Sequence, residues 1–363
     1  MDAREGFDMN GMMRAVVAHG QDNYRYEKVP IPALTGGDML LKVEACGVCA
    51  GDIKCAEGGF RFWGGAGNPA YVEPPFIPGH EIIGRVVEIG ADYAGTCQVG
   101  DRLAVEQIVP CGKCRYCREG KYWLCAPHDV FGFKHYLNGG FAEYVRLPGN
   151  ARVYPIPADM PIEKAALIEP YACGMHAVDR ARIEPNDVVV ISGAGTLGLS
   201  MITAARQLNP RALISIDPMP ARRALAVGMG ADFALPAWAQ EELPSSIVEL
   251  SDNTGCDVYI EASGHPSSIQ QGLNLIKKGG RFVEFSVFAG PASIDWSILG
   301  DAKELDLYGV SLSPHCFPRV IEGIYSGSLA TNGVVTKALP LQDYDIAFQL
   351  GMSREGVKTI LVP

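Results

Sequence analysis

Four cysteines within fifteen residues are the densest group of metal-ligand side chains in this 363-residue sequence. They follow the spacing C-x2-C-x2-C-x7-C, as Cys111, Cys114, Cys117 and Cys125. Four thiolates complete a tetrahedral zinc shell and leave no position for water or substrate, so the pattern predicts a structural metal site. An iron–sulfur cluster uses the same ligand type, but its usual cysteine spacings differ from this one, which favours zinc.

Three further segments contain residues that could hold a second metal ion. They provide Cys49, the adjacent pair His80 and Glu81, and Glu169. One thiolate, one imidazole and one carboxylate form a ligand set suited to zinc, and a catalytic zinc keeps its last position for water or substrate. Each of these residues is commonplace by itself, so the hypothesis of a catalytic zinc depends on the fold bringing them together.

A glycine-rich segment is the third feature with chemical meaning. The apolar run 188–192 leads directly into G-x-G-x-x-G, followed by a helical pattern. Gly193 permits a tight turn, Gly195 lets a pyrophosphate approach the backbone, and Gly198 lets the helix pack close to the strand. The N-terminus of that helix presents free N–H groups to the phosphates. The predicted cofactor contacts of this loop are Gly193, Gly195, Thr196, Leu197 and Gly198.

Asp217 ends the next predicted strand, nineteen residues after Gly198. A carboxylate at this place accepts hydrogen bonds from the ribose hydroxyls and repels a 2′-phosphate, so the sequence favours NAD over NADP. Arg222 could stack on the adenine, and Arg222 or Arg223 could instead accommodate NADP. The alternative is a glycine turn that binds no ligand, with Asp217 as a capping residue.

Composition excludes several other classes of function. The net charge is −10 and the pI is about 5.2, whereas a nucleic-acid-binding protein needs a basic surface. The sequence lacks a run of 18 apolar residues, so we expect no membrane segment. The first residues include acids and no apolar core of a signal peptide, and we therefore expect a cytoplasmic protein.

The order of predicted elements indicates an α/β fold with two kinds of architecture. Short β-like runs broken by Gly and Pro fill residues 14–155 and suggest a small, irregular barrel. A helical pattern covers 163–182. Strands and helices then alternate from 188 to 286, and their continuous apolar strands predict a doubly wound parallel sheet covered on both faces. Two helices and a final strand follow after 316.

These pieces together resemble the medium-chain zinc dehydrogenases, the superfamily of alcohol and polyol dehydrogenases, over nearly the whole chain. The resemblance rests on the four-cysteine segment, the glycine loop and six shorter motifs: Cys46-Gly-Val-Cys49-Ala-Gly-Asp52, Gly79-His-Glu81, Val99-Gly-Asp-Arg102, Gly140-Phe-Ala-Glu-Tyr144, Glu169-Pro170 and Gly356-Val-Lys358. It implies a GroES-like catalytic domain at 1–170, with the zinc lobe at 106–126. A Rossmann NAD domain at 171–315 and a return to the catalytic domain at 316–363 complete the expected organisation.

The resemblance also implies roles for single residues. Cys49 and His80 take the positions of catalytic zinc ligands, and either Glu81 or Glu169 is the acidic ligand. Lys358 is expected to bind the cofactor. Two zinc ions per chain, NAD and a homodimer or homotetramer are the implied cofactors and assembly.

Two positions depart from the family pattern. The family commonly has Ser or Thr two residues after the ligand cysteine, and a His often follows three residues later, to pass on the proton of the alcohol. This chain has Gly51 and Lys54 instead. We therefore expect the proton to leave through water, Lys54, the cofactor ribose, or Glu169 and the water on zinc.

These observations predict the oxidation of a secondary alcohol. Zinc acts as a Lewis acid on a secondary alcohol, and a hydride moves to C4 of NAD. The glycine-rich and aromatic segment 58–71 could cover the substrate, with Phe62 or Trp63 narrowing the pocket, although a packing or interface loop is equally compatible. That segment and Ala50–Cys55 look most like dehydrogenases of tetritols such as erythritol and threitol.

Other functions stay open from the sequence alone. Xylitol, sorbitol, butanediol and L-threonine are alternative substrates in the same superfamily. A zinc-free reductase of this fold would lack both sets of metal ligands. A non-catalytic NAD-sensing protein that has kept its metals is the alternative from a different class.

Overall fold

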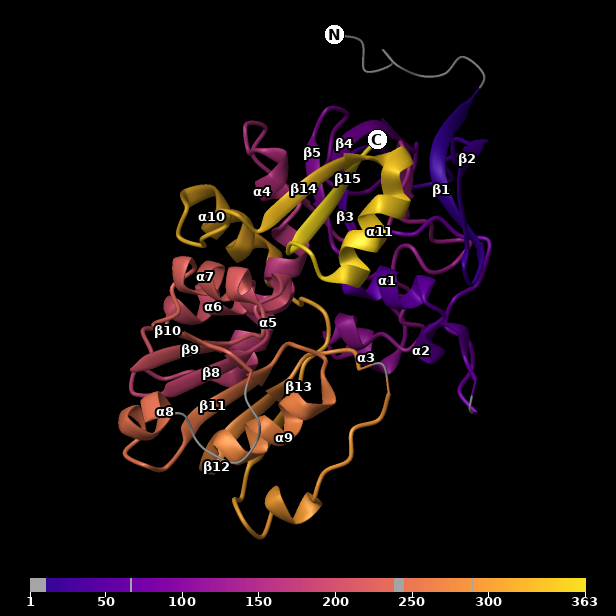
Figure 1. The fold of residues 1–363 in the computed structure, drawn as a ribbon. Coiled ribbons are helices and arrows are strands. Elements are labelled where there is room, and N and C mark those ends of the chain that lie inside the picture. Colours follow the sequence, from indigo (N-terminus) through magenta and orange to yellow (C-terminus); the bar gives the residue numbers. More distant parts are fainter. Residues whose placement is uncertain (1–10, 66, 238–244, 289) are drawn as a thin grey trace. The chain divides into compact units, whose positions relative to one another are not determined.

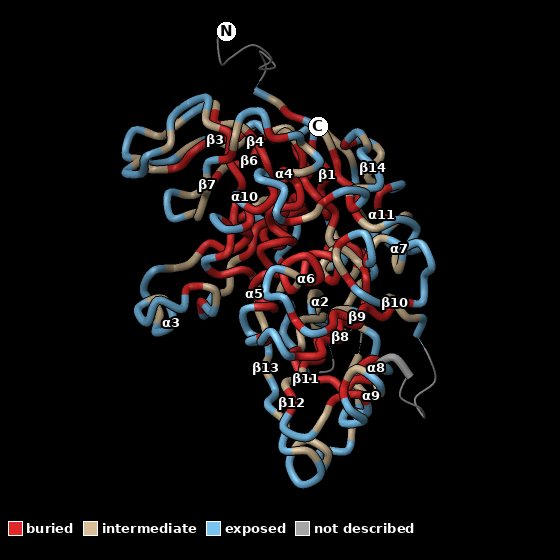
Figure 2. Tube along the Cα trace, turned by 90° about the vertical axis from the view of Figure 1, so that its left-hand side faces the viewer, coloured by how far each residue is buried: buried red, intermediate tan, exposed pale blue. Residues whose placement is uncertain are grey.

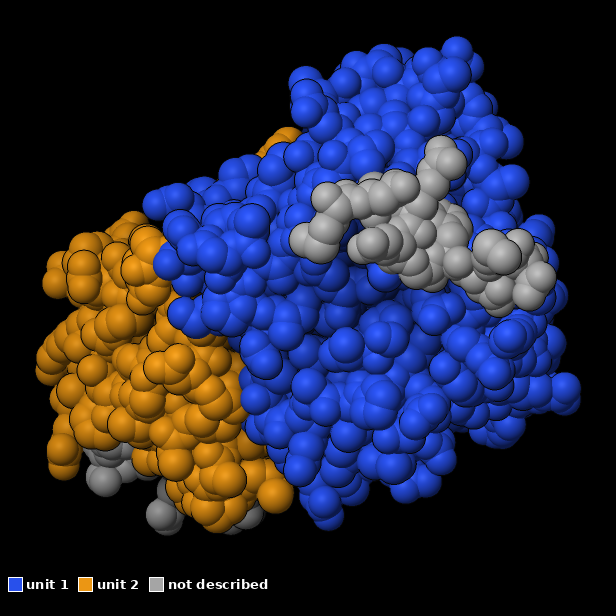
Figure 3. Space-filling model, turned by 90° about the horizontal axis from the view of Figure 1, so that it is seen from above, with its two compact units in different colours: residues 1–169, 317–325, 335–363 blue, residues 170–316, 326–334 orange. Residues whose placement is uncertain are grey.

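The computed structural model describes residues 11–65, 67–237, 245–288 and 290–363, and they form two compact units (Figures 1 and 3). The first unit consists of Met1–Glu169, Phe317–Tyr325 and Val335–Pro363. The second consists of Pro170–Cys316 and Ser326–Val334. We expected all of 316–363 to return to the first domain, but residues 326–334 belong to the second unit.

A seven-stranded sheet forms the centre of the first unit (Figure 1). Its order is β14 (Val335–Pro340), β15 (Lys358–Val362), β3 (Met39–Gly47), β4 (Glu81–Ile89), β5 (Arg102–Val105) and β7 (Val153–Pro155), with β6 (Tyr144–Leu147) also paired to β3. A separate hairpin joins β1 (Met12–Gly20) to β2 (Asn23–Pro30). β3 pairs with β15, β4 and β6 and is therefore the central strand of this sheet.

Antiparallel pairing brings three distant segments to one end of this sheet. Gly47, the last residue of β3, lies opposite Glu81, the first residue of β4. Gly47 also lies opposite Ile360 of β15. The chain segments just beyond these pairs are the turn at Cys49, the residue His80 and the start of β15 at Lys358.

Short helices complete the first unit. α1 (Ala50–Ala56) begins immediately after Cys49, and α2 (Phe60–Trp63) follows it. α11 (Tyr344–Ser353) packs against α1, where Gly351 approaches the side chain of Ile53. The unit also contains α3 (Arg115–Arg118), η1 (Tyr122–Leu124), α4 (Ile162–Ala165), η3 (Leu341–Asp343) and α10 (Phe317–Ser326).

The second unit is built on a six-stranded parallel sheet, which confirms the predicted doubly wound architecture. Its order is β10 (Phe233–Leu235), β9 (Ala212–Ile216), β8 (Val188–Ser192), β11 (Cys256–Glu261), β12 (Ile276–Glu284) and β13 (Asp306–Gly309). The helices of the unit are α5 (Ile168–Ala181), α6 (Thr196–Arg206), α7 (Pro220–Gly228), α8 (Ser245–Leu250) and α9 (Pro266–Leu275), and η2 (Trp296–Ile298) follows β12. The strand order reverses between β8 and β11, which is where ligands bind in sheets of this kind.

Burial explains why the central strands could be recognised from sequence. β8 and β9 are buried at every residue, as Figure 2 shows, because helices cover both faces of a parallel sheet. The edge strand β13 is mostly exposed and has no apolar run, and it was not expected. Every helix in the described part of the chain is too short or too polar to cross a membrane.

Gly198 offers a test of the turn between β8 and α6. A Cβ atom at Gly198 would overlap the backbone carbonyl oxygen of Gly193, which cannot move without opening the turn. We expect Gly198→Ala to lower the free energy of unfolding by about 1–3 kcal/mol, the usual cost of overpacking. Gly228→Ala, at the exposed end of α7 with open space around it, is the control and should not destabilise the protein. Equal stability of the two variants in urea denaturation would contradict this account of the turn.

Candidate active site

The structure brings Cys49, His80 and Glu81 together at the end of β3 and β4. Their candidate ligand atoms, one from each residue, all lie within 4.8 Å of one another. His80 and Glu81 are buried and Cys49 is partly exposed. A thiolate, an imidazole and a carboxylate at this separation fit a tetrahedral zinc ion that retains access on one side.

Asp52 orients the imidazole of His80. One carboxylate oxygen of Asp52 accepts the backbone N–H of Cys49 at 2.9 Å, and the other lies 3.5 Å from Nδ1 of His80. That separation is longer than a good hydrogen bond, and both atoms lack a hydrogen-bond partner among the described residues. A proton on Nδ1 that faces Asp52 leaves Nε2 for a metal, as in the carboxylate–histidine–zinc arrangement.

The charge on this pair agrees with that role. Burial disfavours the imidazolium, but the neighbouring Asp52 carboxylate and Cys49 sulfur outweigh it and raise the pKa of His80 well above its ordinary value. The pocket therefore attracts positive charge. No role was predicted for Asp52, although an acid three residues after a ligand cysteine was the available signal.

Lys358 binds Glu81 in the interior of the first unit. Its ammonium lies 2.7 Å from both carboxylate oxygens of Glu81 and 3.0 Å from the carbonyl oxygen of Val48, and both side chains are buried. Burial alone would lower the pKa of Lys358, but the Glu81 carboxylate reverses this and raises it. We expected Lys358 to bind the cofactor. In the structure its ammonium contacts acceptors of Glu81 and Val48, and its contact with the cofactor stays a prediction.

Glu169 and Lys54 lie outside the group of three ligand atoms. Glu169 is buried in the first turn of α5, and its charge contributes to the raised pKa of Lys358. Its predicted role as a zinc ligand therefore stays a prediction. Lys54 is half-buried near the end of α1, and its proposed part in proton transfer stays a prediction as well.

Aromatic side chains form a wall beside His80. The ring of Phe133 stacks on the imidazole with 5.7 Å between centroids, and Phe62 stacks on Phe133 at 5.4 Å. Tyr71 packs against Phe133 at 5.7 Å. Phe62, a predicted pocket residue, thus belongs to the wall. Phe133 was missed, because nothing in its sequence neighbourhood indicates that it reaches His80.

Contacts of Trp63 and Lys134 support this aromatic wall. The indole N–H of Trp63 donates to the carbonyl oxygen of Cys55 at 2.7 Å, which fixes α2 to α1. The ammonium of Lys134 lies 2.8 Å from Asp129 and 5.2 Å from the centre of the Tyr71 ring. Trp63 therefore supports the wall, and its predicted contact with substrate stays a prediction.

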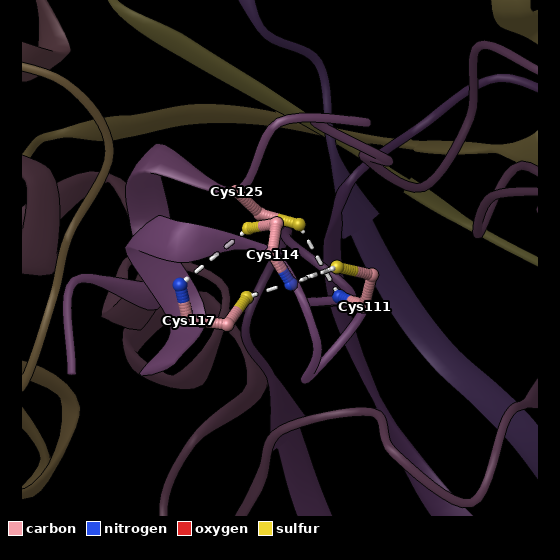
Figure 4. Close-up of side chains that lie close together, drawn as sticks. All are labelled: Cys111, Cys114, Cys117 and Cys125. Carbon is pink, nitrogen blue, oxygen red and sulfur yellow. Dashed lines mark hydrogen bonds between the residues drawn. The ribbon is translucent and has the colours of Figure 1, made fainter. Parts of the chain in front are cut away.

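The four cysteines of the predicted structural site converge in the first unit, as Figure 4 shows. Backbone N–H groups donate to three of the sulfurs, for example from Cys111 to Cys125 at 3.2 Å and from Cys114 to Cys111 at 3.3 Å. Hydrogen bonds from the backbone of Ala126 and Cys117 lower the pKa of Cys114 to about 6. Such donors stabilise the thiolate form that a zinc ion requires.

A partly exposed arginine connects this lobe to the sheet. The guanidinium of Arg152 lies 3.9 Å from the centre of the Tyr122 ring, which belongs to η1 between two of the cysteines. Arg152 also donates to the fully buried Glu106 at 2.9 Å, and the hydroxyl of Tyr154 donates to the same oxygen at 2.8 Å. The lobe is therefore anchored by a charged network in addition to any metal.

The glycine loop of the second unit forms a tight turn between β8 and α6. Gly193 has φ of 101°, which favours glycine, and α6 begins at Thr196. One oxygen of Asp217 accepts the backbone N–H of Ala194 at 2.8 Å, and the other accepts that of Met219 at 2.8 Å. Asp217 thus holds the loop, and its oxygens retain lone pairs for a ligand.

We expect Cys114→Ser to remove one metal ion and leave the other. Zinc content should fall from two ions per chain to one, because a hydroxyl is a poor substitute for the thiolate. The melting temperature should fall by roughly 5–10 °C, since binding of a structural metal is coupled to folding. Mass spectrometry and calorimetry measure these changes. Cys97→Ser, a half-buried cysteine outside both ligand groups, should change neither.

The pair formed by Glu81 and Lys358 has a distinct energetic signature. Lys358→Met leaves a buried carboxylate without its counter-charge and should cost about 3–5 kcal/mol of unfolding free energy. Adding Glu81→Gln should restore much of that loss, because the charge that lacked a partner is gone. Urea denaturation at matched zinc content measures both effects. Arg211→Met, which removes an exposed ion pair with Asp252, should cost less than about 1 kcal/mol. Additive losses in the double variant would contradict the pairing.

Comparison with known proteins agrees with both units. Residues 35–158 match the alcohol dehydrogenase GroES-like domain, and residues 196–325 match the zinc-binding dehydrogenase domain.

The chain is 43% identical to the erythritol/L-threitol dehydrogenase of Mycolicibacterium smegmatis, covering 97% of this chain and 98% of that protein. It is 31% identical to the sorbitol dehydrogenase of Bacillus subtilis, covering 97% of each. A crystal structure of a zinc-binding dehydrogenase from Sinorhizobium meliloti bound to NADP superposes with a TM-score of 0.86 at 27% identity, covering 97% of this chain and 99% of that one. The chain therefore belongs to the medium-chain zinc-dependent alcohol and polyol dehydrogenases and is an oxidoreductase.

Proposed function

We propose that this enzyme oxidises a secondary alcohol of a small polyol with NAD, and that a tetritol of the erythritol or threitol type is its substrate. The observation that carries the proposal is the convergence of Cys49, His80 and Glu81 within 4.8 Å. Similarity to an erythritol/L-threitol dehydrogenase at 43% identity supports the choice of substrate.

The residues of the first unit have separable roles in this proposal. A zinc ion held by Cys49, His80 and an acidic ligand would polarise the alcohol oxygen, so that an alkoxide forms near neutral pH. Asp52 fixes the tautomer of His80 and its orientation. Lys358 holds the carboxylate of Glu81 and limits its movement. Phe133 and Phe62 exclude water from the side of His80 that they cover.

The preference for NAD rests on Asp217 in the second unit. Its carboxylate is buried against the glycine loop, where a 2′-phosphate would meet an uncompensated negative charge. The guanidinium of Arg222 lies beside Gly195, 3.9 Å from the position of a Cβ atom there, which supports its predicted contact with the adenosine half of the cofactor. The hydride acceptor in the proposal is C4 of the bound nicotinamide.

The shape of the site supports a short substrate. The stacked rings of Phe133 and Phe62 lie beside His80, and we infer that they limit the length of the substrate on that side. Pentitols and hexitols are therefore expected to be poorer substrates than tetritols. By resemblance to its family, the enzyme is further proposed to assemble as a homodimer or homotetramer.

A substrate panel with a metal-removal step tests this function. NADH absorbance is followed with erythritol, threitol, xylitol, sorbitol, 2,3-butanediol and L-threonine, each with NAD and with NADP. We expect the highest kcat/KM with a tetritol and NAD, and loss of turnover after chelation that zinc restores. Cys49→Ser should lose the catalytic ion, keep the structural one and show no detectable turnover. Full activity of the chelated Cys49→Ser variant would refute zinc catalysis, and inactivity of the zinc-loaded protein on the whole panel would favour a sensing role.

A further inference from the structure

The segment between β13 and α10 contains a backbone conformation that its sequence does not favour. Leu312 has φ of 54°, in the left-handed region, where a bulky apolar residue is rarely found. Ten non-glycine residues of the described chain have positive φ, and Leu312 is the only aliphatic one among them. Arg182 and Arg354 directly follow α5 and α11, and helix ends commonly have this conformation. Leu312 follows a strand, so other contacts must hold it.

His176 in α5 provides such a contact. Its Nδ1 lies 3.0 Å from the carbonyl oxygen of Leu312. Because a carbonyl oxygen can only accept, Nδ1 carries the proton. Burial lowers the pKa of His176, which keeps the ring neutral near pH 7. A neutral, buried imidazole therefore donates to the peptide group of Leu312 and fixes its orientation.

Other contacts fix the two ends of the same segment. The backbone N–H of Val310 donates to the carbonyl oxygen of Glu284 at 3.0 Å. The thiol of Cys316 donates to the carboxylate of Asp179 at 3.9 Å. Asp179 lies three residues after His176, so both side chains lie on one face of α5. This face of α5 therefore holds the segment 310–316 at two points.

The segment begins at the carboxyl edge of the parallel sheet, where ligands bind in folds of this kind. β13 is parallel to β12, so Gly309 ends at the same edge as β8 with its glycine loop and β9 with Asp217. Asp217, which we expect at the adenosine ribose, lies on the β9 side of the switch point between β8 and β11. The other half of a dinucleotide would then extend past β11 and β12, toward the residues after β13.

A residue in a rarely populated conformation costs free energy and persists only where its surroundings hold it, most often at a functional site. We propose that His176 is a positioning residue for the nicotinamide half of the cofactor, because its Nδ1–H holds Leu312 in the left-handed conformation. The peptide groups of 310–313 are thereby fixed in one arrangement at the edge where that half would bind. This inference rests on the proposed use of NAD and is independent of the alcohol.

NADH and ADP-ribose test this inference, because ADP-ribose lacks only the nicotinamide. His176→Leu removes the N–H donor and keeps a side chain of similar size. We expect its affinity for NADH, measured by NADH fluorescence on the zinc-loaded full chain, to fall roughly fivefold, the size of one lost hydrogen bond. Its affinity for ADP-ribose, measured by calorimetry, should stay unchanged. A general loss of packing would weaken the binding of both ligands.

Two amide variants separate the hydrogen bond from the packing. The side-chain N–H of His176→Asn reaches the place of Nδ1, whereas that of His176→Gln reaches the place of Nε2. We expect His176→Asn to recover most of the affinity for NADH and His176→Gln to behave like His176→Leu. His19→Leu is the matched control, because it removes a histidine that contacts Glu27 at 2.9 Å in the hairpin of the first unit. It should leave the binding of both ligands unchanged.

Equal weakening of NADH and ADP-ribose binding in His176→Leu would overturn the inference, and so would unchanged binding of both. It is also overturned if His176→Asn binds NADH no better than His176→Gln, a comparison that decides by itself if His176→Leu does not fold. A wild-type protein that binds NADPH and not NADH would instead contradict the proposed cofactor. The same comparison with NADPH and 2′-phospho-ADP-ribose then tests His176, so the two failures are distinguishable.

Discussion

The register between β3 and β4 is the constraint on which the metal site depends. Gly47 lies opposite Glu81, so the turn after β3 and the residue before β4 meet at one end of the sheet. Because the side chains of a strand alternate between its two faces, a slip of one residue would turn Glu81 away from Cys49. The pairing of β15 with β3 brings Lys358 to the same end of the sheet. Chain segments hundreds of residues apart thus form one site through backbone pairing.

Charge balance then decides which groups this site can hold. Two buried carboxylates, Asp52 and Glu81, lie beside Cys49, and Lys358 is paired with only one of them. A buried charge is costly unless it is paired, so the remaining negative charge favours a cation. The unsatisfied facing atoms of His80 and Asp52 show the same preference in geometry. A dication at His80 would remove this imbalance, and a neutral pocket-filling group would not.

Local patterns made much of the fold predictable. The apolar run at 188–192 became β8 with the same bounds, and the glycine loop, Asp217 and the four cysteines lie where their spacing placed them. The helix expected at 163–182 is interrupted and forms α4 and α5. Neither β10 nor β13 was expected, because each is short and partly or largely exposed and has no strong apolar periodicity.

The catalytic site was predictable only in part. Cys49, His80 and Glu81 could be selected by resemblance, since no local pattern joins residues so far apart. Lys358 binds Glu81, which lies 277 residues away along the chain. Phe133 stacks on His80 across 53 residues. Neither contact has a local sequence signal. Gly51 shows the opposite case, because the sequence marks it as a departure from the family pattern and the structure places it beside Cys49 and His80. Phe133 stacks on His80, whereas Gly51 leaves room for a methyl group beside Cys49 and His80.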